Sequence, residues 1–468
     1  MQRLMNKANL YRGLVVGLVL IQLLELVVPL NLTILDACFA IGVTILGISR
    51  LSRSFQIATL ILFVAGLGLL STTSLTLSSI ATAVVSMVDI VVLLVVMQLF
   101  LIPVTVGKYQ TAVEEFMQDH VHGPKQTYTF VMLVTHLLSS ILSMGTVAIV
   151  LSILGDSIKR QVKDSARFSA TAVTRAFTLG TLWAPGAATI FLISTVTKVS
   201  WTRLFIPCLI LGLLGLGLAY TMEHHQAYMQ ETPTAVDQNI QRKSGARASL
   251  LELVFAVVTL LVLSFSLMEN HVATSMTAVT LAGLLVVLVW TGLLRFKRGN
   301  QQSAFNPTLK KAVRSYWHQG IASGASLAPF FVGIGTFTYG FQHSTVSTQL
   351  TATLTPTFTY LGWWLVLLIP IIVVLVSLIG IHPLASVALI GKVVMAMPIS
   401  LSPLLIALSL NIGSVVAYML SPFAGIVVIV ATLLNVNPGT VSVRWNWKFC
   451  SVFLGLSVIA SILLNLIF

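Results

Sequence analysis

The sequence predicts an all-α polytopic membrane protein with about eleven transmembrane helices and two re-entrant hairpins in an inverted-topology repeat. Composition gives the membrane class, because 57% of the 468 residues are hydrophobic and only 8% are charged, whereas soluble proteins are about one quarter charged. The apolar runs are continuous rather than alternating, which favours spanning helices over a β-barrel. A motif that occurs in both halves of the chain predicts the repeat.

Eleven apolar runs are long enough to cross a bilayer, since each span needs about 20 apolar residues. They fall into a first half (residues 1–221, six spans) and a second half (residues 249–468, five spans). A polar cytoplasmic linker, residues 222–248, joins the halves; it and the basic loop from Arg295 to Arg314 are expected to be solvated. The predicted spans are 13–30, 34–50, 55–73, 79–106, 168–195, 203–221, 249–267, 272–294, 317–342, 403–432 and 446–468.

Basic residues set the predicted orientation. The formal net charge is +13, but the Lys and Arg residues lie in short loops between spans, which is the positive-inside pattern. This distribution argues against nucleic-acid binding. It predicts a multi-pass protein of the cell (cytoplasmic) membrane with a cytoplasmic N-terminus and an external C-terminus. The first apolar run is interpreted as a retained signal anchor, because no small-residue cleavage site follows it.

Two further apolar stretches are expected to form hairpins that enter and leave the membrane on one side. The stretch at about 128–155 has basic residues on both flanks, so both of its ends are predicted to be cytoplasmic. The stretch at about 361–396 is flanked by segments without Lys or Arg, so it is predicted to enter from the outer side. Each hairpin follows a short polar stretch, about 109–122 and 344–358, that is expected at the interface.

The repeated motif places one proline inside a long apolar run near the end of each half, at Pro185 and at Pro422. Proline removes a backbone donor and breaks the helix, and in lipid the freed carbonyls need partners. A single proline would indicate an ordinary kink. Two breaks at corresponding positions instead point to the substrate site of a repeat-built secondary transporter. Span 55–73 has no counterpart in the second half, so this odd helix inverts the second copy.

Side chains near the hairpin tips are candidates for binding. Small hydroxyl residues and glycine allow tight turns and offer neutral ligands, although each serine is equally consistent with helix packing. His382, beside Pro383, is the best candidate for binding an anion or carrying a proton, with a turn histidine bonded to a carbonyl as the alternative. Lys392 and Arg175 could neutralise an anionic substrate or extend to the interface.

With these features the chain resembles the ion transporter superfamily, which includes the divalent anion/sodium symporters, the citrate-metal symporters and the membrane subunits of tripartite periplasmic transporters. The resemblance covers nearly the whole chain and implies that substrate and sodium bind between hairpin tips and broken helices. The Ser-Asn-Thr signature of the divalent anion/sodium symporters is absent: residues 143–146 match it loosely and residues 380–382 replace it. A dicarboxylate substrate is therefore not implied.

Candidate ligand positions come from the resemblance at the hairpin tips and breaks, and from ionisable residues within apolar segments for His382 and Lys392. The predicted substrate-binding residues are Ser143, Thr146, Trp183, His382, Lys392 and Ser421. The predicted cation (Na+) ligands at the hairpin tips and broken helices are Ser139, Gly145, Pro185, Ser377, Gly380 and Pro422. A homodimer in the lipid bilayer is expected by the same resemblance.

The expected function is Na+-coupled uptake of a small organic anion (a carboxylate) by alternating access. The alternative is a cation/proton antiporter or exchanger on the same fold, for which Asp36, Asp89 and Asp156 are in range. No acidic residue follows Glu269, which favours sodium on carbonyls and hydroxyls over protons on carboxylates. A subunit that depends on a separate binding protein is disfavoured, because no long outer loops are evident. An enzyme is not expected, because zinc-protease, nucleophile-elbow and phosphate-loop motifs are absent; no cofactor is expected either.

Overall fold

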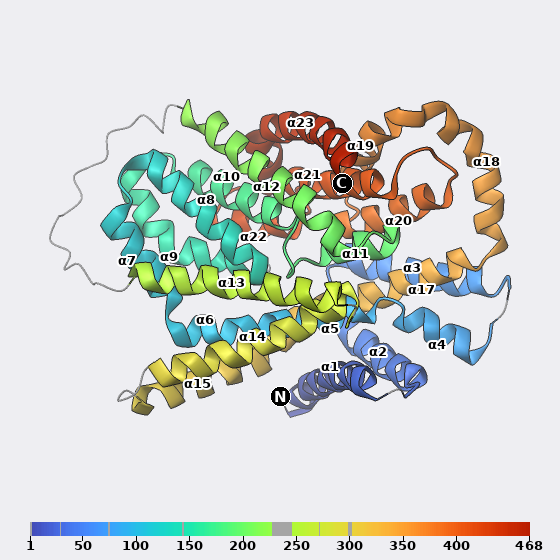
Figure 1. Ribbon diagram of the computed structural model, residues 1–468, viewed down its shortest axis with the longest axis horizontal. Coiled ribbons are helices and arrows are strands. Elements are labelled where there is room, and N and C mark those ends of the chain that lie inside the picture. Colours follow the sequence, from blue (N-terminus) through green and yellow to red (C-terminus); the bar gives the residue numbers. More distant parts are fainter. Residues whose placement is uncertain are drawn as a thin grey trace.

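The computed structural model describes residues 2–28, 30–73, 75–142, 145–226, 246–270, 272–297 and 302–468. Every regular element within these residues is a helix, and ten helical segments among them are long and apolar enough to cross a membrane. The prediction of an all-α polytopic membrane protein is therefore confirmed. Figure 1 shows the helices gathered into two bundles, one above the other in that view.

The lower bundle in Figure 1, here called the flanking bundle, combines the start of each half of the chain. α3 packs along α17, and α14 packs on α5 and α6. The two halves are therefore interleaved in this bundle. Its helices are α1 (Gln2–Val27), α2 (Thr33–Gly47), α3 (Arg53–Leu70), α4 (Leu77–Val85), α5 (Val88–Met97), α6 (Leu101–Gly107), α13 (Ala246–Glu269), α14 (Ser275–Lys297), α15 (Gln302–Ser315), α16 (Ile321–Gly324) and α17 (Ala328–Gln342).

The upper bundle, here called the hairpin bundle, combines the end of each half. Two helices connect the bundles at opposite ends of Figure 1, α7 (Tyr109–His120) and α18 (Thr345–Leu361), and they coincide with the two polar stretches expected at the interface. The helices of the hairpin bundle are α8 (Gly123–Leu142), α9 (Gly145–Gln161), α10 (Ser165–Gly180), α11 (Ala188–Thr197), α12 (Trp201–His224), α19 (Leu365–Leu378), α20 (Pro383–Ala396), α21 (Pro403–Leu420), α22 (Gly425–Leu434) and α23 (Trp445–Ile467).

Helix starts in the hairpin bundle follow from local chemistry. The side chains of Asp164, Ser200 and Ser402 accept hydrogen bonds from first-turn N–H groups of α10, α12 and α21, which satisfies donors that have no partner within the helix. Pro403 and Pro383 occupy first-turn positions of α21 and α20, where the missing N–H is not needed.

Two sets of five helices in the hairpin bundle repeat one arrangement. α8 packs on α10 as α19 packs on α21, and each short half-helix packs on the hairpin of the other set, α11 on α20 and α22 on α9. α11 and α22 both contain 10 residues, and both end at a left-handed residue, Lys198 and Asn435. These two residues are as far apart in the chain as Pro185 and Pro422 are. The pairs α8–α9 and α19–α20 occupy the two segments predicted as hairpins.

One segment predicted as solvated loop is a helix. α15 (Gln302–Ser315) lies within the basic stretch from Arg295 to Arg314 and packs on α6. Phe305 and Ala312 are buried, and Lys311 is exposed. The apolar residues recur at helical spacing, but a search for continuous apolar runs passes over such an amphipathic segment. Most of the predicted 222–248 linker, residues 227–245, lies outside the described residues.

Two predicted spans also change in extent. α1 begins at Gln2, whereas the predicted span begins at residue 13. The helix continues through polar residues such as Arg12, which are not part of the apolar run. The span predicted at 79–106 is one helical segment long enough to cross a membrane, Leu77–Gly107. A turn near Ser86 and a 3-10 helix at Gln98–Phe100 divide it into α4, α5 and α6. Continuous hydropathy does not report such turns, because they leave the apolar run uninterrupted.

Candidate functional site

The first break, residues 181–187, separates α10 from α11 and is closed by contacts from other helices. The Asn411 side-chain amide donates to the Leu182 carbonyl (2.9 Å), and the Trp201 indole donates to the Trp183 carbonyl (3.1 Å). The Gly186 N–H donates to the Ser140 carbonyl at the tip of the first hairpin (3.2 Å). Carbonyls freed by a break in a membrane helix need such partners, so the break is a built feature of the fold.

Gly186 is required by this contact. A Cβ atom at this position would lie 2.9 Å from the Ser140 carbonyl oxygen, a backbone atom, and 3.6 Å from Met97 Cε of the flanking bundle. Glycine therefore permits the break and the hairpin tip to approach each other.

The second break, residues 421–424, separates α21 from α22. The Ser421 hydroxyl donates to the Ser377 carbonyl in the second hairpin (2.9 Å) and accepts from the Phe423 N–H (3.3 Å). Ser140 and Ser377 have the same separation in the chain as Pro185 and Pro422. In both halves, the break therefore donates a hydrogen bond to the carbonyl of the corresponding serine. The sequence motif identified both breaks, and the structure adds the hairpin contacts.

The two breaks also meet each other. The Tyr418 side chain, just before the second break, lies against Thr189, just after the first. The half-helices that follow the breaks, α11 and α22, both start without a side-chain cap. Helix N-termini carry a partial positive charge and unpaired N–H donors, so the region between the breaks is suited to an anionic group.

The first hairpin tip contributes neutral oxygen atoms. The Ser139 hydroxyl donates to the His136 carbonyl (2.8 Å), which leaves its lone pairs available. The Thr146 hydroxyl is fully buried and has no hydrogen-bond partner among the described residues. Gly145 is exposed at the start of α9. Ser143, predicted to bind substrate, lies outside the described residues.

The second hairpin tip faces the flanking bundle. Gly380 adopts a φ of +100°, which favours glycine, and the Ser377 hydroxyl lies 3.2 Å from that of Ser386. The His382 ring lies 4.1 Å from the Phe55 ring of α3 and 5.5 Å from the Tyr418 ring, between centroids. Its Nδ1 accepts from the Leu384 N–H (3.2 Å). His382 therefore caps α20 and contacts both bundles at once.

Trp183 makes structural contacts. Its indole donates to His136 Nε2 (3.0 Å), and His136 Nδ1 lies 3.1 Å from the Ala176 carbonyl. Because an indole only donates and a carbonyl only accepts, His136 is a neutral ring held by both neighbours. The roles of His136, Asn411 and Trp201 were not predicted from the sequence. An amide within an otherwise apolar span was the available signal for Asn411.

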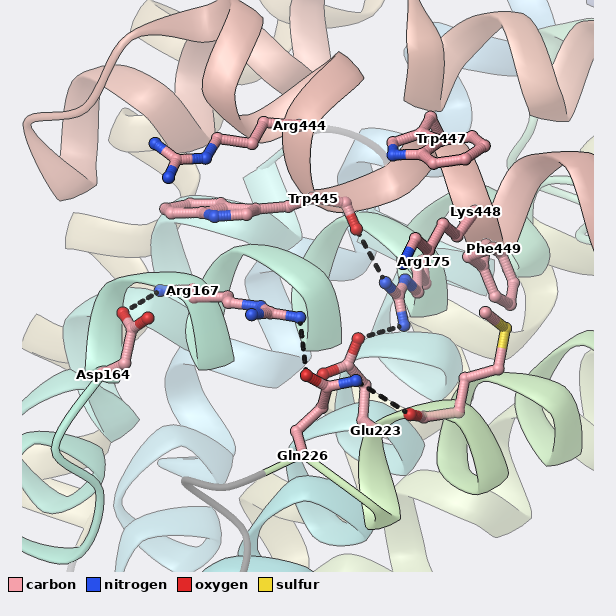
Figure 2. A pocket seen from close by; sticks show the side chains of 11 residues that line it. Asp164, Arg167, Arg175, Glu223, Gln226, Arg444, Trp445, Trp447, Lys448 and Phe449 are labelled. Atoms are coloured by element: carbon pink, nitrogen blue, oxygen red, sulfur yellow. Dashed lines mark hydrogen bonds and ion pairs between the residues drawn. The ribbon is translucent and has the colours of Figure 1, made fainter.

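The two basic candidates lie away from the hairpin tips. Lys392 is about 13 Å along α20 from the start of that helix at Pro383 and lies near Lys198 at the end of α11. Arg175 lies near the opposite end of the bundle, where its Nη1 pairs with Glu223 (2.9 Å) and Nη2 donates to the Trp445 carbonyl (3.1 Å) (Figure 2). The structure thus brings Ser421, Pro422, Ser377, Gly380 and His382 together at one tip, and Ser139, Gly145, Thr146, Trp183 and Pro185 at the other.

Chemically, this arrangement offers backbone carbonyls, hydroxyls and helix N-termini. No cluster of three His, Cys, Asp or Glu side chains able to hold a metal ion occurs in the described part of the chain. The oxygen ligands at the tips are neutral, a type of donor that suits a monovalent cation better than a transition metal.

No protein-family model and no curated protein sequence matches the chain. Among solved structures, it is similar to the YdaH transporter of Alcanivorax borkumensis, with a TM-score of 0.60 and 14% identity over 88% of this chain and 98% of that one. It is also similar to MtrF of Neisseria gonorrhoeae, described with a class of antimetabolite efflux pumps, with a TM-score of 0.56 and 14% identity over 88% and 94% of the two chains. These similarities show a shared fold; the narrower resemblance to the ion transporter superfamily stays a prediction.

Proposed function

We propose that the protein is a secondary active transporter that couples sodium entry to uptake of a small organic anion, with the substrate held between the two hairpin tips and the two helix breaks. The matched hairpin-to-break hydrogen bonds carry this proposal. Gly186 bonds to the Ser140 carbonyl, and Ser421 bonds to the Ser377 carbonyl. Paired discontinuous helices of this kind hold substrate and ions in repeat-built transporters. The shared fold with two transporters agrees with it.

An anionic substrate follows from the charges around the site. Four helix N-termini belong to the hairpin tips and breaks, those of α9, α11, α20 and α22, and each favours negative charge. The second hairpin and the second break lie in residues 270–468, which contain no acidic side chain. A carboxylate ligand would therefore meet no like-charged side chain from this part of the chain.

Sodium is the coupling ion in this proposal because the available ligands are neutral oxygens. In the first half, the buried Thr146 hydroxyl still has its hydrogen-bonding capacity, beside Ser139, Gly145 and Pro185. In the second half, the corresponding ligands are Ser377, Gly380 and Pro422. Coupling to a proton would instead need a titratable side chain. Among the candidate binding residues, His382 is the titratable one that lies at a hairpin tip.

The proposed orientation places the N-terminus in the cytoplasm and the C-terminus outside. The Arg203 guanidinium donates to the Phe468 carbonyl (3.1 Å), so the last residue lies beside the start of α12, on the side predicted to be external. A homodimer is also part of the proposal. α13 and α14 leave large apolar side chains exposed, including Phe255, Leu288 and Phe296.

Transport in proteoliposomes tests the function. Purified protein would be supplied with radiolabelled mono-, di- and aromatic carboxylates under an inward sodium gradient, a potassium gradient or a pH gradient. We expect accumulation of one class only with sodium, and a strong loss in Ser421→Ala. Ser409→Ala is the matched control, because that buried hydroxyl bonds only within its own helix, to the Leu405 carbonyl. Sodium-independent flux, or equal loss in both variants, would contradict the proposal.

Proton-driven export is the second candidate. Asp36 is buried in α2 with one carboxylate oxygen lacking a partner among the described residues, and Gln22 bridges it to Glu25. The similarity to MtrF adds a precedent for efflux. Transport driven by the pH gradient, insensitive to sodium and lost in Asp36→Asn, would favour this candidate over sodium-coupled uptake.

A further inference from the structure

A second pocket lies in the hairpin bundle, apart from the tips and breaks. Its volume is about 470 Å³, and it opens between α10, the end of α12 and the start of α23 (Figure 2). In the proposed orientation, the pocket lies at the cytoplasmic end of the bundle. Only this placement at the cytoplasmic membrane surface depends on the proposed orientation. Its lining residues are Asp164, Arg167, Arg175, Met222, Glu223, Gln226, Arg444, Trp445, Trp447, Lys448 and Phe449.

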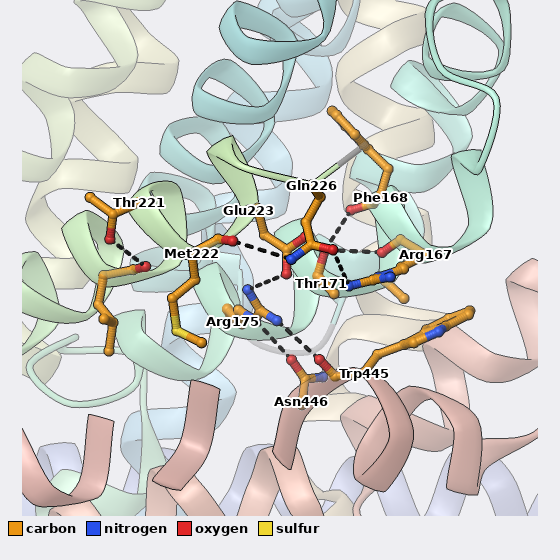
Figure 3. Close-up of polar contacts among 12 residues, drawn as sticks. Arg167, Phe168, Thr171, Arg175, Thr221, Met222, Glu223, Gln226, Trp445 and Asn446 are labelled. Carbon is orange, nitrogen blue, oxygen red and sulfur yellow. Dashed lines mark hydrogen bonds and ion pairs between the residues drawn. The ribbon is translucent and has the colours of Figure 1, made fainter. Parts of the chain in front are cut away.

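Polar contacts of Arg175 hold the inner wall of the pocket together. Arg175 is 1% exposed, and besides its ion pair with Glu223 it donates from Nε to the Asn446 side chain (2.8 Å) (Figure 3). Its guanidinium also stacks on the Phe449 ring, 4.6 Å from the centroid. Asn446 in turn donates to the Thr174 hydroxyl (3.2 Å) and the Val441 carbonyl (2.9 Å). The guanidinium therefore joins α10 to α12 and α23 through Glu223, Asn446 and the Trp445 carbonyl, and we assign it a structural role.

The rim of the pocket carries an excess of positive charge. Arg167, Arg444 and Lys448 line it, while its two acids are already used: Glu223 pairs with Arg175, and Asp164 caps α10. Arg444 and Lys448 are exposed, and no ion pair between described residues includes either of them. In Figure 2, Arg444 lies over one side of the pocket, with Arg167 on the other side.

Aromatic side chains place this rim at a membrane surface. Trp445 and Trp447 lie between Arg444 and Lys448 at the start of α23, and Trp447 is 49% exposed. Tryptophan is enriched at the boundary between lipid and water, and basic residues there attract anionic headgroups. The pocket is also within the usual size range for ligand sites, about 300–1,000 Å³.

We propose that this pocket binds a phosphate group, either in the headgroup of an anionic phospholipid or as a soluble phosphate. The exposed Arg444 guanidinium offers a planar pair of donors that matches phosphate oxygens, and Lys448 adds a second exposed positive charge. Arg167 donates to Gln226 (3.0 Å) and contributes charge to the rim. Nothing in this site overlaps with the hairpin tips or the breaks, so it is independent of the transported substrate.

The test compares two double variants of the full-length protein in detergent by native mass spectrometry. Arg444→Gln with Lys448→Gln removes the exposed rim charges and leaves Arg175 intact. Lys310→Gln with Lys311→Gln removes two exposed charges from α15, outside the pocket. The probes are phosphatidylglycerol, phosphatidylcholine and inorganic phosphate. We expect the rim variant to bind phosphatidylglycerol about 25-fold more weakly, at about fivefold per basic residue, and the α15 variant to bind as the wild type does.

Each outcome decides the proposal. Selective loss of phosphatidylglycerol in the rim variant supports a lipid headgroup, and selective loss of inorganic phosphate supports a soluble source. Equal weakening in both double variants would mean diffuse surface attraction and would overturn the proposed site. Wild-type protein that prefers phosphatidylglycerol no more than phosphatidylcholine, and that shows no phosphate binding, would also overturn it. Unchanged thermal stability of the rim variant without added ligand serves as the folding control.

Discussion

The two helix breaks share one framework but differ in how completely they are enclosed. The first break is buried from Leu182 to Ala187 and is closed by Asn411, Trp201 and the first hairpin tip. The second break is linked to its hairpin by one side-chain hydrogen bond, and its Phe423 is 63% exposed. We therefore expect opening the first break to cost more free energy than opening the second. The two breaks therefore share one backbone arrangement, but we expect the second break to open more easily than the first.

The largest effect is expected at Gly186, whose counterpart by sequence separation is Phe423. Gly186→Val places a side chain against the Ser140 carbonyl, where the backbone cannot yield, and we expect destabilisation by about 3 kcal/mol. Phe423→Ala removes an exposed ring and should change the stability little. Thermal unfolding of both variants in the same detergent makes the comparison. Equal melting temperatures for the two would contradict the difference between the breaks.

Asn411 provides the next largest effect. Asn411→Leu keeps the size of the side chain but leaves the Leu182 carbonyl without its partner, which costs about 1–3 kcal/mol for a buried group. Thermal unfolding should show a clear loss for this variant and a small one for Ser409→Ala on the same helix. A wild-type melting temperature for Asn411→Leu would mean that the first break does not depend on the second half.

A smaller effect on stability is expected for Ser421→Ala. The variant removes one hydrogen bond to the Ser377 carbonyl, which contributes about 1 kcal/mol. Because this bond joins the second break to its hairpin, transport should fall more than stability does. Parallel measurement of uptake and melting temperature separates the two. Loss of stability with unchanged uptake would assign the bond to folding alone.

The smallest effect is expected at Ile379, which is 78% exposed at the second tip, whereas its counterpart Leu142 is 1% exposed at the first. Ile379→Ala should change the free energy of unfolding by no more than about 0.5 kcal/mol, as surface substitutions usually do. Leu142→Ala is the matched variant and should cost about 2–5 kcal/mol. Similar losses of stability in the two variants would show that Ile379 packs against a surface that does not belong to this chain.

The sequence predicted the helical membrane class and the positions of the two breaks, because each depends on local composition or on proline. Helix pairs occupy the two segments predicted as hairpins, and their re-entry into the membrane stays a prediction. The sequence did not predict how the breaks are closed. Asn411 reaches Leu182 across the two halves, and Trp183 turns toward His136, so these contacts depend on how helices cross. Hydropathy alone carries no such information.

The same limit applies to charged side chains. The sequence marked Arg175 and Lys392 as unusual within apolar segments, but it could not indicate which end of the bundle each one occupies. Lys392 lies beside Lys198, and Arg175 binds Glu223. The binding roles of the residues predicted at the tips stay predictions that the transport assays test.

Lys198 and Lys392 lie near each other on helices that pack together, α11 and α20. In the proposed transport cycle, a shift of these helices along the membrane normal would move two positive charges through the electric field. A charge that crosses the full field changes the free energy by about 2.3 kcal/mol per 100 mV, so an interior-negative potential would pull this pair inward. The transport cycle would then be voltage-dependent even with an electroneutral load of substrate and ions.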